Sequence, residues 1–206
     1  MRIEGLQKLT LLDYPGRMAC TVFLGGCNFR CPFCHNSDLL PVGKVPAAVQ
    51  EAELMEFLHK RQGILDGVCV TGGEPLLNAD IGTLLEKIKA LGYAVKLDTN
   101  GSRPEALKAL VGAGVVDAVA MDIKNSPARY AETVGMRAFD LTPVRESVAY
   151  LLTGAVPFEF RTTVVREFHD EDSFTEIGRW IKGAPRYFLQ GFVDSERVLE
   201  GGLHPC

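Results

Sequence analysis

The amino-acid sequence predicts an α/β protein, an open, partial (β/α)6 barrel with parallel strands. Short runs of apolar and β-branched residues, bounded by glycine or polar residues, are typical of buried strands. Such runs occur at residues 18–24, 67–70, 93–97, 115–121, 158–165 and 187–192. Strands that alternate with helices favour a parallel sheet with right-handed crossovers. A closed barrel needs eight such units and roughly 250 residues, so about six units in 206 residues predict a barrel that stays open.

Helical spacing of apolar residues follows most of these strands. The spacing is clearest in residues 81–91, where Leu84, Leu85 and Ile88 fall on one face and Gly92 ends the pattern. Further helices are predicted at residues 48–62, 104–111, 144–152 and 173–181, and a short one at 128–134.

The remaining stretches carry no clear pattern. We expect residues 1–17 to form an irregular lead-in, residues 35–47 a loop, and residues from about 194 to 206 a tail without an assigned structure. Nothing in the sequence marks an internal repeat or a domain boundary, so we expect one domain over residues 1–206.

Composition argues against several classes of function. The formal net charge of −4 disfavours a nucleic-acid partner held by general electrostatics. No apolar run approaches the roughly 18 residues of a membrane span, and the first residues lack the pattern of a signal peptide. We therefore expect a cytoplasmic protein whose cysteines are metal ligands, redox groups or buried thiols. Cys20 and Cys69 fall inside predicted strands and are expected to be buried, whereas Cys206 ends the chain.

A loop after the first strand carries three closely spaced cysteines, Cys27, Cys31 and Cys34. Four thiolates usually hold a [4Fe–4S] cluster, one per iron. Three would leave one iron without a protein ligand, and an open coordination position is typical of a catalytic metal centre. The alternative is a zinc site with the adjacent His35 as fourth ligand, although zinc sites commonly pair two cysteine elements and a second pair is missing here.

Polar motifs follow the predicted strands at the ends where parallel α/β folds bind ligands. After the cysteines come Gly72-Gly73-Glu74, Asp98-Thr99-Asn100, Asp122 with Lys124, and Arg161 within the fifth strand. Because these strand ends meet at one rim, we expect a single site. Arg161 occupies a position that alternation predicts to be buried, so its guanidinium needs an anion, and Glu159 on the same face is one candidate.

Each motif also has a purely structural interpretation. Two glycines alone indicate a tight strand-to-helix turn, an Asp-Thr-Asn-Gly run suits an Asx turn, and an exposed aspartate–lysine pair has little energetic value. His35 and Asn36 either cap the cysteine loop or shape the surroundings of a cluster.

The spacing Cys27-x3-Cys31-x-Phe33-Cys34 resembles the CxxxCxΦC signature of the radical S-adenosylmethionine (radical SAM) enzymes, where Φ is aromatic. Those enzymes have a (β/α)6 partial barrel, and residues 71–75 resemble their GGEP motif. Within the superfamily the chain resembles the glycyl-radical-enzyme activases, most of all the anaerobic ribonucleoside-triphosphate reductase activating proteins. Residues 5–16 and 34–36 carry this narrower resemblance.

The resemblance implies two cofactors, one [4Fe–4S] cluster per chain and S-adenosylmethionine (SAM). The amino and carboxylate groups of SAM would chelate the open iron, and reductive cleavage would give a 5′-deoxyadenosyl radical that abstracts hydrogen from the substrate. The implied partners are a glycyl radical enzyme, the large subunit of anaerobic ribonucleotide reductase, and a flavodoxin- or ferredoxin-type reductant.

The resemblance also assigns roles to residues. Cys27, Cys31 and Cys34 would hold the metal. The expected cofactor-binding residues are Phe33, Gly72, Gly73, Glu74, Asp98, Lys124 and Arg161, the last through the SAM carboxylate. Asp98, Thr99 and Asp122 are expected to hold a monovalent cation, and His169 is a weaker candidate for adenosine contact.

Two other functions remain open at the level of sequence. A compact radical SAM enzyme acting on a small molecule, such as a deazapurine-forming synthase, would carry the same cysteine motif. A non-catalytic electron carrier or zinc-binding module would use the cysteines without cleaving SAM.

Overall fold

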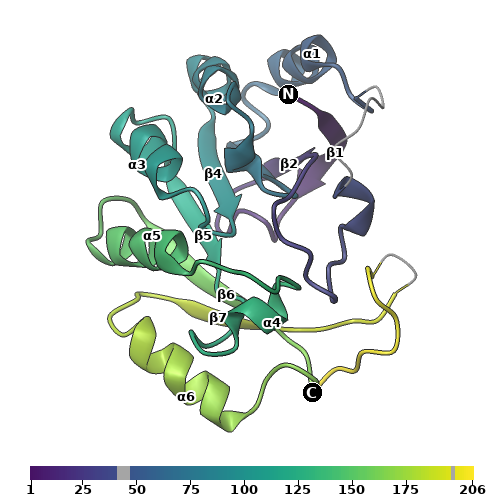
Figure 1. The fold of residues 1–206 in the computed structure, drawn as a ribbon. Coiled ribbons are helices and arrows are strands. Elements are labelled where there is room, and N and C mark those ends of the chain that lie inside the picture. Colours follow the sequence, from purple (N-terminus) through teal and green to yellow (C-terminus); the bar gives the residue numbers. More distant parts are fainter. Residues whose placement is uncertain (41–46, 196–197) are drawn as a thin grey trace.

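Six parallel strands form the body of the sheet in this computed structural model, which describes residues 1–40, 47–195 and 198–206. They are β2 (Ala19–Leu24), β3 (Gly67–Gly72), β4 (Ala94–Thr99), β5 (Ala118–Asp122), β6 (Phe158–Val164) and β7 (Tyr187–Gly191). The strands follow one another in chain order across the sheet, with β1 (Ile3–Thr10) antiparallel to β2 at one edge. In the described part of the chain no ladder joins β1 to β7, so the predicted parallel partial barrel is confirmed (Figure 1).

Helices form an arc around the outside of this sheet (Figure 1). They are α1 (Glu51–Arg61), α2 (Ile81–Ala90), α3 (Pro104–Gly112), α4 (Tyr130–Thr133), α5 (Thr142–Leu152) and α6 (Glu171–Trp180), with single 3-10 turns η1 (Ser37–Leu39) and η2 (Pro75–Leu77). Proline fits the first turn of α3, where no amide partner is needed. The Asp170 carboxylate accepts a hydrogen bond from the Ser173 amide and so caps α6.

The expected irregular lead-in is wrong for most of its length, because Ile3–Thr10 form the edge strand β1. Of its eight residues only Ile3 and Thr10, the two ends, are buried, so the sequence between them lacks the alternation that identifies a half-buried strand. The strand pairs instead through its backbone, with Leu6 opposite Val22.

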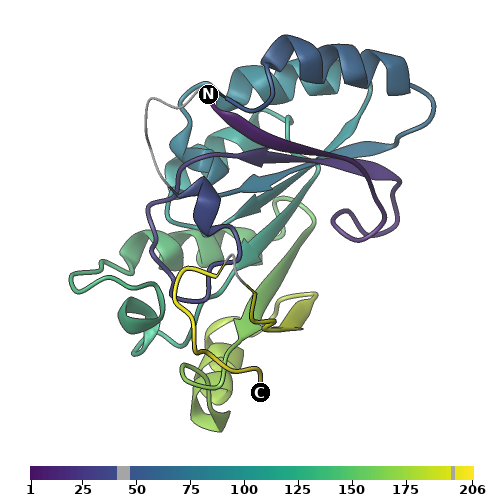
Figure 2. The ribbon, with the colours of Figure 1, turned by 90° about the vertical axis from the view of Figure 1, so that its right-hand side faces the viewer.

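Two other stretches without a predicted element are partly described. The loop at residues 35–47 contains η1, while residues 41–46 lie outside the described part. The tail returns to the cysteine loop, since the Glu200 amide donates to the carbonyl oxygen of Pro32 at 2.9 Å. Figure 2 shows this segment beside the loop.

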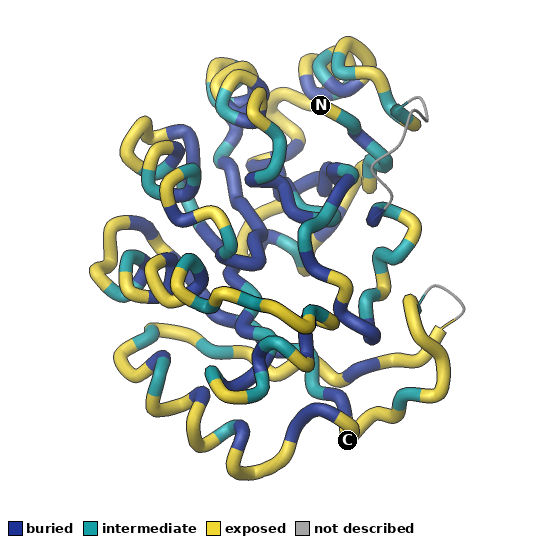
Figure 3. The backbone as a smooth tube through the Cα atoms, in the orientation of Figure 1, coloured by how far each residue is buried: buried dark blue, intermediate teal, exposed yellow. Residues whose placement is uncertain are grey.

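The core lies between the sheet and the helices and extends into the barrel (Figure 3). Strand residues such as Val70, Leu97 and Phe160 are fully buried, as expected for parallel strands that are covered on both faces. Charged side chains are also buried inside the barrel, among them Lys96 and Glu159. No described helix is both long and apolar enough to cross a bilayer.

Candidate active site

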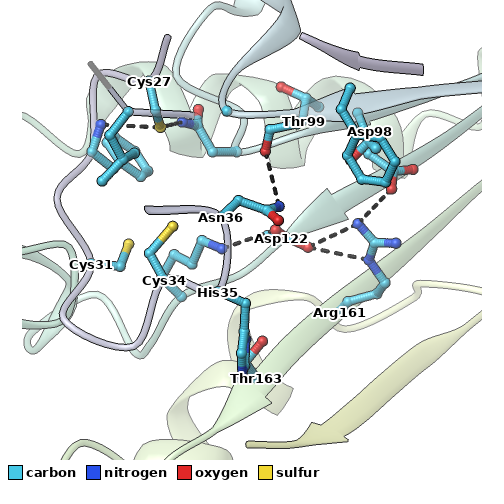
Figure 4. A pocket seen from close by; sticks show the side chains of 18 of the residues that line it. Cys27, Cys31, Cys34, His35, Asn36, Asp98, Thr99, Asp122, Arg161 and Thr163 are labelled. Carbon is cyan, nitrogen blue, oxygen red and sulfur yellow. Dashed lines mark hydrogen bonds and ion pairs between the residues drawn. The ribbon is translucent and has the colours of Figure 1, made fainter. Parts of the chain in front are cut away.

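The carboxyl ends of the parallel strands open onto one cavity of about 310 Å³. It gathers all of the site residues expected from the sequence except Glu74 and His169, namely Cys27, Cys31, Phe33, Cys34, Gly72, Gly73, Asp98, Thr99, Asp122, Lys124 and Arg161. Figure 4 shows the three cysteines on one side and the Asp98–Arg161–Asp122 group on the other. Each parallel strand from β2 to β7 therefore contributes residues, either its own or those of the loop that follows it, to a single site.

The three motif cysteines line this cavity, with Cys31 buried and Cys27 and Cys34 partly exposed. Burial raises the pKa of the Cys31 thiol to about 12, despite the opposing effect of Lys124, and also raises the pKa of Cys27. Free thiols at Cys27 and Cys31 are therefore protonated at neutral pH, and a metal must displace these protons to bind.

The three thiols suit an iron–sulfur cluster by their chemistry. In the described part of the chain, no three His, Cys, Asp or Glu side chains converge on a point that could hold one metal ion. The Nε2 atom of His35, the fourth ligand of the zinc alternative, is 2.6 Å from the carbonyl oxygen of Val193. Three thiols spread around a cavity offer the soft ligands that an iron–sulfur cluster takes.

The double glycine explains how two loops approach so closely at this cavity. The Gly73 amide donates to the carbonyl oxygen of Leu24 at 2.8 Å. A Cβ atom on Gly73 would lie 2.0 Å from the carbonyl oxygen of Gly26 and 3.3 Å from the Cβ of Cys27. Gly72 has φ +122°, a conformation that side chains rarely adopt. The motif thus forms a tight turn that packs against the start of the cysteine loop.

Glu74 has a different place from the one expected, because its carboxylate lies beneath the cavity and does not line it. Fully buried, it accepts hydrogen bonds from the Leu76 amide at 3.0 Å, the Thr99 hydroxyl at 2.9 Å and the Asn100 amide at 2.6 Å. It therefore joins the loop after β3 to the loop after β4. Burial raises its pKa to about 7, although these three hydrogen bonds oppose the shift.

This pKa gives a pH dependence that the Glu74→Gln variant should lack. The unfolded chain loses the Glu74 proton near pH 4.5 and the folded chain loses it near pH 7. The contribution of the protonated carboxyl to the free energy of unfolding is therefore complete below pH 4.5 and is lost as pH rises through 7. The expected loss is about 3 kcal/mol. Anaerobic urea unfolding of both proteins from pH 5 to 8 should show wild type losing stability relative to the variant. Parallel curves would contradict the assignment.

The anions that contact Arg161 lie on β5, the adjacent strand, and on β4, the strand beyond it. Its guanidinium is 3.1 Å from Asp98 and 3.1 Å from Asp122, whereas the Glu159 carboxylate contacts Lys96 at 3.7 Å. The ladder explains this, because Asp122 and Arg161 are direct partners in the β5–β6 register. The expectation that Glu159 could pair with Arg161 is therefore wrong.

Two lysines complete this group of charges. Lys96 is 2.7 Å from Asp98, and Lys124 is 2.9 Å from Asp122. Burial alone would raise the pKa of Asp122, but Lys124 and Arg161 lower it to about 2. Burial likewise opposes the charge on Lys124, yet Asp122 raises its pKa above the usual value. Both groups stay ionised at neutral pH, and alternating charges line this wall of the cavity (Figure 4).

The residues expected to hold a monovalent cation lie together but already have partners within the chain. Both oxygens of Asp98 and both of Asp122 contact a lysine or Arg161. The Thr99 hydroxyl donates to Glu74 and accepts from the Gly101 amide. The negative charge is thus balanced by protein cations, and a bound cation stays a prediction.

His169 is placed to support Lys124 and not to face a ligand in the cavity. Its Nε2 atom is 2.9 Å from the backbone oxygen of Lys124, its Nδ1 atom lies near Val165, and its ring stacks on Phe174. Asn36, in contrast, lines the cavity and donates to the backbone oxygen of Gly72.

Part of the cavity wall was not predicted from the sequence. This part includes Gln7, Asp13, Thr21, Thr163 and Gln190. Thr163 shares a strand with Arg161 at a spacing of two, so alternation could have found it. Gln7 and Gln190 come from the two edge strands, where burial gives no pattern to follow.

Comparison with known proteins agrees with this geometry. The family model described as "Radical SAM superfamily" matches residues 21–176. A Methanocaldococcus jannaschii protein named "Putative glycyl-radical enzyme activating enzyme" is 31% identical over 204 residues, covering 96% of this chain and 82% of that protein. The pyruvate formate-lyase-activating enzyme of Listeria monocytogenes is 27% identical over 197 residues, covering 89% and 77%.

Two further similarities are narrower. The 7-carboxy-7-deazaguanine synthase of Hyperthermus butylicus is 40% identical over 94 residues, which cover 44% of this chain and 38% of that enzyme. The crystal structure of SuiB from Streptococcus suis superposes with a TM-score of 0.68 at 14% identity, over 87% of this chain and 40% of that one. The second similarity concerns the fold alone.

Three findings agree with one another. They are the cysteine spacing, the open parallel barrel and the match over 96% of this chain to a protein named as a putative activating enzyme. The cofactors of the family are a [4Fe–4S] cluster and SAM, and the cavity offers three thiols for the first beside a charged wall suited to the second. The chain belongs to the radical SAM superfamily and, within it, to the glycyl-radical-enzyme activating enzymes.

Proposed function

We propose that this chain installs a glycyl radical on anaerobic ribonucleoside-triphosphate reductase. The observation that carries the proposal is a single cavity that is lined by the three thiols and also reaches both edge strands of the sheet. Gln7 of β1 and Gln190 of β7 both line the cavity, so it extends to the edges that remain unpaired with each other in the described chain. A segment of a partner protein could enter there.

Different residues of the cavity would bind the cluster and SAM. Cys27, Cys31 and Cys34 would hold the cluster, and the backbone at Gly72-Gly73 together with Lys124 and Arg161 would hold the amino-acid end of SAM. When bound, the two cofactors supply a one-electron reductive cleavage that yields the 5′-deoxyadenosyl radical. The chain itself positions the reactants and keeps water out, and buried Phe29 and Phe33 beside the cysteines serve the second purpose.

The barrel edge favours a protein substrate. Strand β7 is exposed along four of its five residues, and Phe188 and Leu189 are 45% and 56% exposed. Exposed apolar residues on the free side of an edge strand are common where another chain binds. A flavodoxin- or ferredoxin-type protein is the proposed source of the electron, and the cytoplasm the proposed compartment, in keeping with six free cysteines.

The test is anaerobic reconstitution of the cluster, followed by reduction in the presence of SAM and the large subunit of the reductase. We expect 5′-deoxyadenosine and a glycyl radical signal in the electron paramagnetic resonance (EPR) spectrum. Reductase whose radical glycine is replaced by alanine is the control and should give no such signal. Formation of 5′-deoxyadenosine without any glycyl signal would contradict the proposed substrate.

The match to a deazaguanine synthase supports a second candidate, an enzyme acting on a purine-like small molecule. Its 40% identity over 94 residues exceeds that of the full-length relatives, although it covers less than half of the chain. The same reaction, run with a deazapurine precursor in place of the reductase, separates the two. SAM cleavage coupled to a new purine product would favour the second candidate.

A further inference from the structure

The Cys27 sulfur receives hydrogen bonds from two N–H donors, one of which is a side chain. The Phe29 amide lies 3.4 Å from the sulfur, and the Nδ2 atom of Asn100 lies 3.8 Å from it. We propose that Asn100 is a fixed hydrogen-bond donor to the Cys27 ligand that raises the reduction potential of the cluster. Because this role requires the cluster, it depends on the proposed function, although it involves neither the partner enzyme nor SAM.

The orientation of the Asn100 amide follows from its partners. The backbone amide of Ser102 donates to the Oδ1 atom of Asn100 at 2.9 Å, and only the oxygen of the side chain can accept that bond. The NH₂ group must then face the other way, where it donates to the Asn28 Oδ1 atom at 3.0 Å and points at Cys27. The donor therefore faces the sulfur because its oxygen is engaged elsewhere.

The side chains around Asn100 form a closed group that holds it in place. Asn28 donates to the Ser102 hydroxyl at 2.9 Å, and that hydroxyl can return a bond to Asn28 at 3.3 Å. Asn28 directly follows Cys27, so this group joins the cysteine loop to the loop after β4. Asn100 is only 5% exposed, and few waters can compete for its N–H groups.

The backbone at Asn100 is anchored from below as well. Its amide donates to the buried Glu74 carboxylate at 2.6 Å. The next residue, Gly101, has φ +75°, and a Cβ there would lie 2.0 Å from the Met121 side chain. The Ser147 hydroxyl donates to the backbone oxygen of Gly101 at 2.7 Å. The position of the donor is thus set by hydrogen bonds to the backbone of Asn100 and Gly101 before any cluster binds, as preorganised electrostatics requires.

A hydrogen-bond donor to the Cys27 sulfur favours reduction of the cluster. Reduction adds negative charge to the cluster and its thiolates, and an N–H aimed at a ligand sulfur stabilises that charge. The reduced form therefore gains more than the oxidised form, and the reduction potential rises. Loss of the donor should make the cluster harder to reduce without changing its ligands.

The experiment is an EPR-monitored redox titration of the reconstituted holoprotein without SAM. We expect the midpoint potential of Asn100→Ala to shift to a more negative value, with iron content and melting temperature near those of wild type. Ser102→Ala is the matched control, because it disturbs the same group of side chains but keeps the backbone amide that orients Asn100. Its potential should stay at the wild-type value.

A second variant tests the same role if Asn100→Ala loads too little cluster for the titration. Asn100→Asp keeps an acceptor for Ser102 and places an oxygen in place of the donor, so its potential should also become more negative. An unchanged potential in a loaded Asn100 variant, or an equal shift in Ser102→Ala, would overturn the role. So would failure of both folded Asn100 variants to load iron, which would assign Asn100 to cluster retention. A negative glycyl radical assay would leave the role intact.

Discussion

Replacing Cys31 with alanine is expected to abolish formation of 5′-deoxyadenosine and to lower the iron content of the reconstituted protein. Cys31 is the buried member of the three thiols, and its sulfur faces the cavity that the other two share. With only two thiolates left, the cluster would lack a protein ligand at a second iron. The measurement is chromatographic detection of 5′-deoxyadenosine after anaerobic reduction with SAM, beside iron analysis of the same sample.

Cys69→Ala is the matched control for that loss. Cys69 is also buried, but it lies within β3 and not on the cavity. Removing its sulfur should cost about 1 kcal/mol of stability, as for other small truncations in a core, and should leave iron content and SAM cleavage intact. Retention of product formation by Cys31→Ala, or its loss in Cys69→Ala, would place the cluster elsewhere.

The sequence was sufficient to predict the six parallel strands along the chain, the open partial barrel and the rim at which the motifs meet. Parallel strands covered on both faces are apolar throughout, so β3 and β5 stand out from their polar ends. Strand β1 could not be found this way, because an edge strand with few buried residues pairs through its backbone and leaves little trace in the side chains.

The partners of the charged residues depend on which positions face each other between neighbouring strands, and composition does not predict that register. Arg161 was correctly expected to need an anion, but its partner Asp122 is set by the register between β5 and β6. Glu74 is a carboxylate, a group that is rarely buried, so nothing in the sequence pattern indicated that it joins two loops from beneath the cavity.

Gly73→Ala is expected to destabilise the protein by more than about 3 kcal/mol and to prevent cluster loading. The added Cβ would lie 2.0 Å from the carbonyl oxygen and 2.6 Å from the carbonyl carbon of Gly26, which belong to the backbone and cannot rotate away. Overpacking against a flexible side chain costs about 1–3 kcal/mol, and a rigid neighbour places the cost above that range. The displaced backbone leads directly into Cys27, so the cysteine loop should move with it.

Gly178→Ala is the matched control, because it makes the same substitution at a position with space for a Cβ atom. Gly178 lies within α6, and a Cβ there would meet nothing within 4 Å. Alanine should stabilise the helix by about 0.5–1 kcal/mol, with iron content unchanged. Urea midpoints and iron per chain, measured for both variants, separate a steric effect at the turn from a general effect of losing glycine. If Gly73→Ala loads a full cluster and unfolds at the wild-type midpoint, the close contact between Gly73 and Gly26 does not position the cysteine loop.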